Sequence, residues 1–274
     1  MPKLLVLDKS IFRGTSLTKL CRFAKSHHIL AGNVLLIECL ISPNRIDRNL
    51  LNRFQKLIKA GAMYTHLLFE IVNREKELLS PIKSIVDKNG TDTIRTSTLN
   101  DNEVYLKWGS EKYQAQVGPV VKDMLKLSEY FYADIAKRKW LCRMRKETND
   151  KASRLRKWAK TMEPVVDNKV LKEWEPDVCS YITHDWYTWH DYRLRCILSF
   201  EWAYQKAKSG QLPGFDKASH DFHDMQYVAC LSRADGILTN DKDLVIPLAQ
   251  AAFPEKDVFS SLDDVPDEYL YDWT

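Results

Sequence analysis

Four acidic side chains in this 274-residue sequence are spaced so that they could together bind a cation. Asp8 follows an apolar run, Asp241 follows a second short apolar stretch, and Glu38 and Asp224 lie in stretches with helical periodicity. The carboxyl ends of the strands in an open parallel sheet form its ligand-binding edge, so we expect Asp8 and Asp241 to meet there. Converging carboxylates repel one another unless a cation neutralises them, and oxygen ligands suit Mg²⁺ or Mn²⁺. Such a site can activate a water molecule for phosphodiester hydrolysis.

The N-terminal residues predict alternating strands and helices that would position these acids. Residues 3–8 form an apolar run that ends in an acid, which is typical of a strand buried on both faces. The elements predicted next are a helix over 17–23 capped by Ser16, a strand over 28–31, and a helix over 34–40 that is capped by Asn33 and carries Glu38.

The C-terminal residues repeat this alternation. The predicted elements are a helix over 221–234, a strand over 236–239, a helix over 244–252 and a strand over 257–259. Strands that alternate with helices favour a parallel sheet covered on both sides. The long middle of the chain is mostly helical in period, with an interruption over 88–117 in which residues 104–108 predict a hairpin.

We therefore predict an α/β fold: a Rossmann-like, three-layer α/β/α parallel sheet with a large, mainly helical insertion. Residues 1–58 and 205–262 are assigned to the core, and residues 59–204 to a helical, basic insertion. Residues 263–274 form an acidic C-terminal tail, which is either disordered or laid over a basic surface.

Several stretches at the two ends of the chain resemble those of a known family. They are LLVLDKS at 4–10, IECL at 37–40, DMQYVA at 224–229 and ADGILTND at 234–241. Together they resemble the PIN-domain ribonucleases. The resemblance says nothing about the residues between these two ends. It implies a PIN-like fold and metal-dependent cleavage of single-stranded RNA.

The resemblance assigns catalytic and metal-binding roles to Asp8, Asp224 and Asp241, with Glu38 as the fourth acid. Glu70 lies in a similar apolar helical setting and is an alternative to Glu38. An outer shell is expected around these acids, in which Ser10 either contacts the metal or a phosphate or caps a helix. The candidate outer-shell residues are Ser10, Asp221, Thr239, Asn240 and Asp243.

Residues 137–160 are strongly basic, with eleven Lys and Arg against two acids. Such a charge excess beside Trp140 and Trp158 suits a phosphate backbone with stacked bases. A solvated helix face is the alternative interpretation. The candidate nucleic-acid contacts are Arg143, Arg145, Arg154, Arg156 and Lys157. The aromatic residues over 181–204 predict helix packing rather than a platform for bases.

Composition narrows the classes of protein. The 41 Lys and Arg against 37 Asp and Glu give a net charge of +4, which is too small to identify a partner. The N-terminal apolar run is too short for a signal peptide, and no apolar stretch is long enough to cross a bilayer. Six cysteines without a CxxC pair argue against a zinc ribbon or a disulfide framework. We therefore expect a soluble, cytoplasmic protein with no membrane partner.

The leading hypothesis is a metal-dependent endoribonuclease. A catalytically inactive PIN-like module that binds RNA or protein, and a nuclease that acts on DNA, remain alternatives. A protein inhibitor or antitoxin and a second copy of the chain are candidate partners. A metal-dependent HD phosphohydrolase is disfavoured because that class is all-helical, although four His residues directly precede an Asp: His184, His190, His220 and His223.

Overall fold

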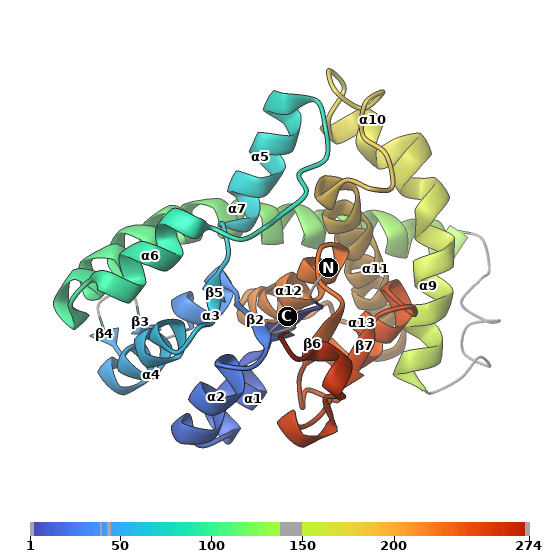
Figure 1. The fold of residues 1–274 in the computed structure, drawn as a ribbon. Helices are drawn as coiled ribbons and strands as arrows, with labels where there is room; N and C mark the ends of the chain where they lie inside the picture. Colours follow the sequence, from blue (N-terminus) through green and yellow to red (C-terminus); the bar gives the residue numbers. More distant parts are fainter. Residues whose placement is uncertain (1–2, 39, 43–44, 138–149, 272–274) are drawn as a thin grey trace.

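The centre of the molecule is a parallel β-sheet. The computed structural model describes residues 3–38, 40–42, 45–137 and 150–271 (Figure 1). Five strands follow the order β5-β2-β1-β6-β7, and every neighbouring pair is parallel. These strands are β1 (Leu4–Leu7), β2 (His28–Ala31), β5 (Met63–Tyr64), β6 (Gly236–Leu238) and β7 (Asp257–Phe259). The α/β class and the parallel sheet predicted from the sequence are confirmed.

Strand β1 is the middle strand, and it joins the two ends of the chain. It pairs with β2 on one side and β6 on the other, with Leu5 opposite both Ile29 and Gly236. Leu5, Val6 and Leu7 are fully buried, as expected for a strand covered on both faces. Residues 8 and 239, which follow β1 and β6, therefore lie at the same carboxyl edge.

Helices from both ends of the chain pack around the sheet, which is consistent with a three-layer α/β/α fold. Ser16 caps its helix by accepting a hydrogen bond from the Lys19 N–H, as predicted. The helices are α1 (Lys9–Gly14), α2 (Leu17–Ala24), α3 (Asn33–Ile37), α4 (Arg48–Lys59), α12 (Phe215–Ala229) and α13 (Val245–Ala252).

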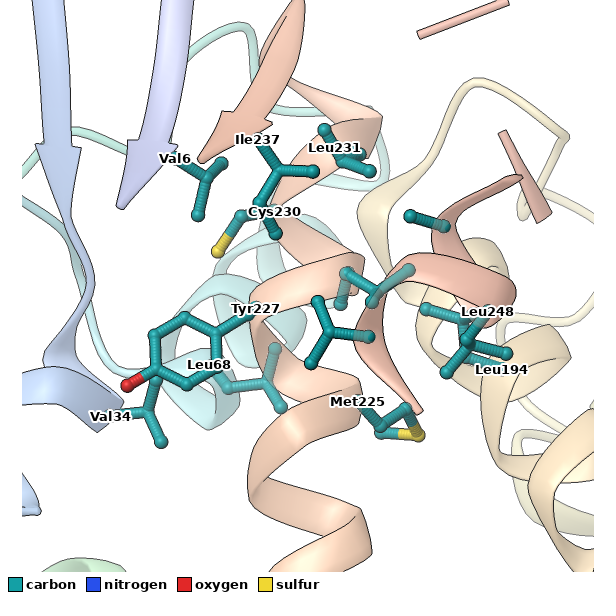
Figure 2. Packing of buried hydrophobic residues seen from close by; sticks show 14 of the residues in the cluster. Val6, Val34, Leu68, Leu194, Met225, Tyr227, Cys230, Leu231, Ile237 and Leu248 are labelled. Carbon is teal, nitrogen blue, oxygen red and sulfur yellow. The ribbon is translucent and has the colours of Figure 1, made fainter. Parts of the chain in front are cut away.

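Helix α12 is deeply embedded between the sheet and other helices (Figure 2). Its residues Met225 and Tyr227 are fully buried. Figure 2 shows the helix between Val6 and Ile237 of the sheet and Leu194 and Leu248 of neighbouring helices. This packing fixes the helix that carries Asp224.

The middle of the chain is helical, as predicted. Helix α11 packs against α7 and α9, and its aromatic side chains are buried, which confirms the packing role predicted for them. Tyr181, which precedes the helix, is 51% exposed and differs from that prediction. None of the helices in the described ranges is long and apolar enough to cross a membrane. The helices are α5 (Leu68–Leu78), α6 (Lys88–Thr96), α7 (Leu99–Lys137), α9 (Lys151–Val165), α10 (Leu171–Trp174) and α11 (Tyr187–Ser209), and a π-helical segment, Val166–Val170, joins α9 to α10.

The hairpin predicted at 104–108 is wrong, because these residues lie inside α7. The helix starts with a reciprocal cap: the Thr98 N–H donates to Asp101 Oδ2 at 3.1 Å, and the Asp101 N–H donates to Thr98 Oγ1 at 3.2 Å. The interruption predicted over 88–117 is therefore occupied by α6 and the first half of α7.

The helix predicted over 34–40 is shorter, and its predicted cap is wrong. Helix α3 begins at Asn33, with Gly32 at the N-cap, and ends at Ile37. The Asn33 side chain donates to the Tyr64 hydroxyl instead of capping the helix. Leu40 starts a small antiparallel pair, β3 (Leu40–Ser42) with β4 (Arg45–Ile46), so Glu38 lies just after the helix.

Two features bear on the predicted division of the chain. Strand β5 follows residue 58, so the sheet extends beyond the residues assigned to the core. The part of the acidic tail that the structure describes packs against the core: Tyr269 is buried, and Asp263 and Glu268 pair with Lys19 and Lys3.

Candidate functional site

Asp8 is held at the carboxyl edge of the sheet by hydroxyl groups from two chain segments. It lies directly after β1, is nearly fully buried and caps α1. Its Oδ2 atom accepts hydrogen bonds from Ser10 Oγ at 2.6 Å and Thr239 Oγ1 at 2.7 Å. Ser10 and Thr239, both predicted outer-shell residues, thus orient this carboxylate. Among the described residues, every hydrogen bond to the Asp8 side chain is received by Oδ2.

Asp241 is positioned by the same network. Its backbone N–H donates to Thr239 Oγ1 at 3.0 Å, and the backbone N–H of Asn240 donates to Ser10 Oγ at 2.8 Å. The Asp241 Oδ1 atom accepts hydrogen bonds from the N–H groups of Asp243 and Leu244 at 2.8 and 2.9 Å. Asn240 and Asp243 therefore contribute backbone N–H groups, while their side chains are exposed.

Glu38 is engaged through both oxygen atoms. Tyr227 of α12 donates its hydroxyl to Oε2 at 2.5 Å, and the Lys9 ammonium group pairs with Oε1. These contacts connect the end of α3 with α1 and α12. Glu70 lies elsewhere, in α5, where it pairs with Lys112 at 2.8 Å.

Asp224 is the least compensated acid of the group. Its half-buried carboxylate receives no hydrogen bond from any described residue. Burial, followed by the charges of Asp241, Glu38 and Asp8, raises the pKa of Asp224 to about 7, and Lys9 opposes this rise. Because the charges of three predicted acids act on the fourth, Asp224, we treat them as one site. It is called the four-acid site (Asp8, Glu38, Asp224 and Asp241). Glu38, and not Glu70, belongs to it.

The four-acid site is not arranged as a preformed cation cage. Within the described residues, no three His, Cys, Asp or Glu side chains are grouped so that they could hold a metal ion. In this conformation the charges of Asp241, Glu38 and Asp8 act on Asp224 across the sheet edge.

Asp221 is directed into the protein instead of toward the four-acid site. Its Oδ2 atom accepts a hydrogen bond from the Trp202 indole N–H at 3.0 Å, and its Oδ1 atom pairs with Lys217. Burial lowers the pKa of Lys217, but the hydrogen bond to Asp221 and the charges of Asp221, Asp224 and Asp241 outweigh burial and raise it overall.

Three site residues were missed by the sequence analysis: Lys9, Lys217 and Tyr227. Lys9 directly follows Asp8, and Tyr227 lies one helical turn after Asp224. This spacing was a usable signal for Tyr227, because residues three apart share a helix face. No sequence pattern predicts the pairing of Lys9 with Glu38 across the sheet edge.

In the described part of the basic stretch, the cations do not all face the same way. Arg143 and Arg145 lie outside the described residues. Arg154 is directed inward: its side chain is 12% exposed and pairs with the buried Glu201 at 2.7 Å. The predicted RNA contact through Arg154 is therefore corrected, because its charge already has an internal partner. Arg156 and Lys157 are exposed on α9.

Trp158 is also unavailable to stack on a base, which corrects a second expectation for this stretch. It is 2% exposed, and its indole N–H donates to Glu201 Oε2 at 2.9 Å. The tryptophan and Arg154 therefore share one buried carboxylate.

The histidines of the four His-Asp pairs do not form a common centre. His184 is exposed and contacts Asp167. Burial, followed by the charges of His220 and Lys9, lowers the pKa of His223 to about 4, so this ring is neutral at pH 7. The His223 ring packs beside that of Tyr113, with 5.6 Å between the ring centroids.

Comparison of the chain with protein-family models, with curated proteins and with solved structures found no match. The interpretation of the four-acid site therefore depends on its own residues and geometry.

Proposed function

We propose that this chain is a PIN-like, metal-dependent endoribonuclease that hydrolyses phosphodiester bonds in single-stranded RNA. The observation that carries the proposal is the Asp224 carboxylate, which lies half-buried among three other acids without a hydrogen bond from the described residues. A structural acid in such a place is normally paired, because an unpaired buried charge is unfavourable. A bound cation would compensate the negative charge of Asp224.

The oxygen atoms left free by the protein support this proposal. Asp8 uses only Oδ2 and Asp241 uses only Oδ1 for hydrogen bonds with described residues. One oxygen of each, and both oxygens of Asp224, are thus free to bind Mg²⁺ or Mn²⁺. These hard oxygen donors match what the two ions prefer.

The three aspartates would hold the ion, and Glu38 would stay with Lys9 and Tyr227. The bound ion would lower the pKa of a water molecule and stabilise charge on the phosphate oxygens. The Asp224 side chain can rotate toward the other acids without losing a hydrogen bond. This rotation would allow its carboxylate to bind the same ion as Asp8 and Asp241. The hydrogen bonds from Ser10 and Thr239 hold the Asp8 carboxylate in place, so its free oxygen would bind the ion at a fixed position.

The proposed substrate is RNA because the family resemblance implies it and because Arg156 and Lys157 leave positive charge exposed on α9. The predicted protein inhibitor, homodimer and cytoplasmic location stay predictions.

Cleavage of a labelled single-stranded RNA, with the same sequence as DNA in parallel, tests the proposal. We expect RNA cleavage with Mg²⁺ or Mn²⁺ and none with EDTA. Asp224→Asn should lower the rate by about 100-fold or more, because a ligand charge is lost. Asp216→Asn is the matched control, since Asp216 is exposed on the same helix, and it should cut at the wild-type rate.

The outcomes separate the alternatives. Wild-type cleavage by Asp224→Asn would reject the four-acid site as catalytic. Cleavage of DNA alone would change the substrate. RNA binding without cleavage in either metal would favour a non-catalytic binding module. One observation favours that second candidate: Lys9 and Lys217 already supply positive charge beside the acids.

A further inference from the structure

The N-terminal part of the chain carries a local excess of positive charge. Residues 9–69 contain ten Lys and Arg against two acids, Glu38 and Asp47. Seven of the ten cations lie in α2, at its C-cap or in α4, and neither helix contains an acid. The two helices pack against each other beside the sheet (Figure 1). Most of the excess therefore belongs to one pair of adjacent helices.

Six of these cations form two rows, which together are called the α2/α4 basic face. Within each row the residues are three positions apart, so they share one side of their helix. Each row extends along the helix axis for about 9 Å. The rows are Lys19, Arg22 and Lys25 in α2 and its C-cap, and Arg53, Lys56 and Lys59 in α4.

The Cys21 thiol connects the two rows. It belongs to α2, and its Sγ atom donates a hydrogen bond to the backbone carbonyl of Lys56 in α4 at 3.7 Å. Burial raises the pKa of this thiol, and the charges of Arg53, Lys25 and Lys56 oppose the rise. Because cations of both helices act on the same sulfur atom, the two rows form one surface.

Most cations of the α2/α4 basic face have no acidic partner. Lys19 pairs with Asp263, and the Arg53 guanidinium donates to backbone carbonyls of α1 and its C-cap. Like charges on one surface repel one another, and an anion lying across them would relieve the repulsion. The remaining four are exposed and form no ion pair with a described residue: Arg22, Lys25, Lys56 and Lys59.

The chemistry of this face suits phosphate groups better than an acidic protein. The centre of a protein–protein interface usually contains apolar and aromatic side chains. None of the large apolar side chains that are exposed in the described residues lies in α2 or α4. A nucleic-acid backbone needs no such centre, because Lys and Arg bind its phosphates by charge and hydrogen bonding. Charge complementarity therefore favours a polyphosphate backbone.

We infer that the α2/α4 basic face binds the phosphate backbone of single-stranded RNA, where the choice of RNA rests on the proposed function. The contacts are to phosphates and not to bases, since α2 and α4 present no exposed aromatic ring for stacking. Each helix leads from the carboxyl edge of the sheet to the start of the next strand, β2 or β5. RNA bound along the rows thus has one end directed toward the edge that holds the four-acid site.

Anisotropy of a fluorescein-labelled oligouridine tests this inference, with EDTA present so that no metal-dependent cleavage occurs. The test variant of the full chain replaces the four unpaired cations with Gln. At about 0.1 M salt it should bind about 100-fold more weakly than the wild type. Its slope of log affinity against log salt should fall by about 0.7 for each lost phosphate contact. Thermal melting shows that the variant is folded. Its substitutions are Arg22→Gln, Lys25→Gln, Lys56→Gln and Lys59→Gln.

A control variant removes the same charge from exposed positions outside α2 and α4, and it should bind within about twofold of the wild type. Its substitutions are Lys83→Gln, Lys122→Gln, Lys126→Gln and Lys172→Gln. Wild-type binding by the folded α2/α4 variant, or an equal loss in both variants, would overturn the inference.

The binding result is separate from the proposed hydrolysis. Binding that depends on the α2/α4 basic face, without cleavage in Mg²⁺ or Mn²⁺, would support this inference and reject the nuclease. Cleavage by the wild type together with unchanged binding by the α2/α4 variant would keep the nuclease and overturn this inference.

Discussion

The helical region and the carboxyl edge of the sheet both bury charged groups, but they compensate them differently. In the helical region the Glu201 carboxylate receives hydrogen bonds from Arg154 and Trp158. At the sheet edge Asp224 receives none from the described residues, although three other acids act on it. Buried charges with specific partners are explained by the fold alone. An acid without such a partner needs another explanation, and a cation provides one.

The largest loss of stability from a substitution should come from breaking a compensated charge. Glu201→Gln should lower the free energy of unfolding by about 3 kcal/mol, because it removes the buried carboxylate charge that Arg154 and Trp158 share. Asp263→Asn is the control: the Asp263 side chain is 72% exposed and that of its partner Lys19 is 45% exposed, so loss of this pair should cost less than about 1 kcal/mol. Urea unfolding measures both. Similar losses in the two variants would remove the contrast between buried and exposed pairs.

At the carboxyl edge of the sheet, a bound metal ion should increase the stability of the protein. At a concentration about 100 times its Kd, Mg²⁺ or Mn²⁺ should stabilise the wild-type protein by about 2.7 kcal/mol. In Asp224→Asn the same concentration should give about 1 kcal/mol or less, because one ligand charge is missing. Calorimetric melting with and without metal tests this. An equal shift in both proteins would place any bound metal away from Asp224.

The pH dependence of the metal-free protein should reveal the crowded acids. Because the folded pKa of Asp224 is about 7, above the unfolded value near 4, its protonated form contributes stability that is fully present below pH 4. This contribution should fall by about 4 kcal/mol as the pH rises from 4 through 7, because about three pKa units separate the two states. Asp224→Asn should lack the decrease. Urea unfolding from pH 4 to 8 measures it, and parallel curves for the two proteins would contradict the pKa.

The smallest effect is expected on the exposed face of α9. Replacing Arg156 and Lys157 with Gln should lower the slope of log affinity for RNA against log salt by about 0.7 for each phosphate that the variant no longer neutralises. Lys88→Gln, on the exposed surface of α6, should leave the slope unchanged. RNA binding titrated at several salt concentrations tests this. An unchanged slope in the α9 variant would mean that this face is only solvated.

The parts of the fold that depend on local sequence were predictable. The apolar run before Asp8, the cap at Ser16 and the short strand before Thr239 all determine their elements within a few residues. These same stretches place Asp8 and Asp241 at one edge, because parallel strands align their carboxyl ends. The convergence of these two acids therefore followed from pattern and topology together.

Partnerships between distant residues were not predictable. Arg154 belongs to a basic run in the sequence, and only its contact with Glu201, 47 positions later, turns it inward. Lys9 likewise meets Glu38 because α1 and the end of α3 are adjacent in space. Charge counts in a sequence state how many ions are present but not which of them neutralise one another.

The central position of β1 has a consequence for biosynthesis. Its neighbour β6 is synthesised more than 220 residues later than β1. A chain emerging from the ribosome must therefore add all of the intervening residues before Thr239 can reach Asp8. A product truncated before β6 would lack that hydrogen bond, together with Asp241. The four-acid site is consequently assembled only after β6 and the residues that follow it have been synthesised.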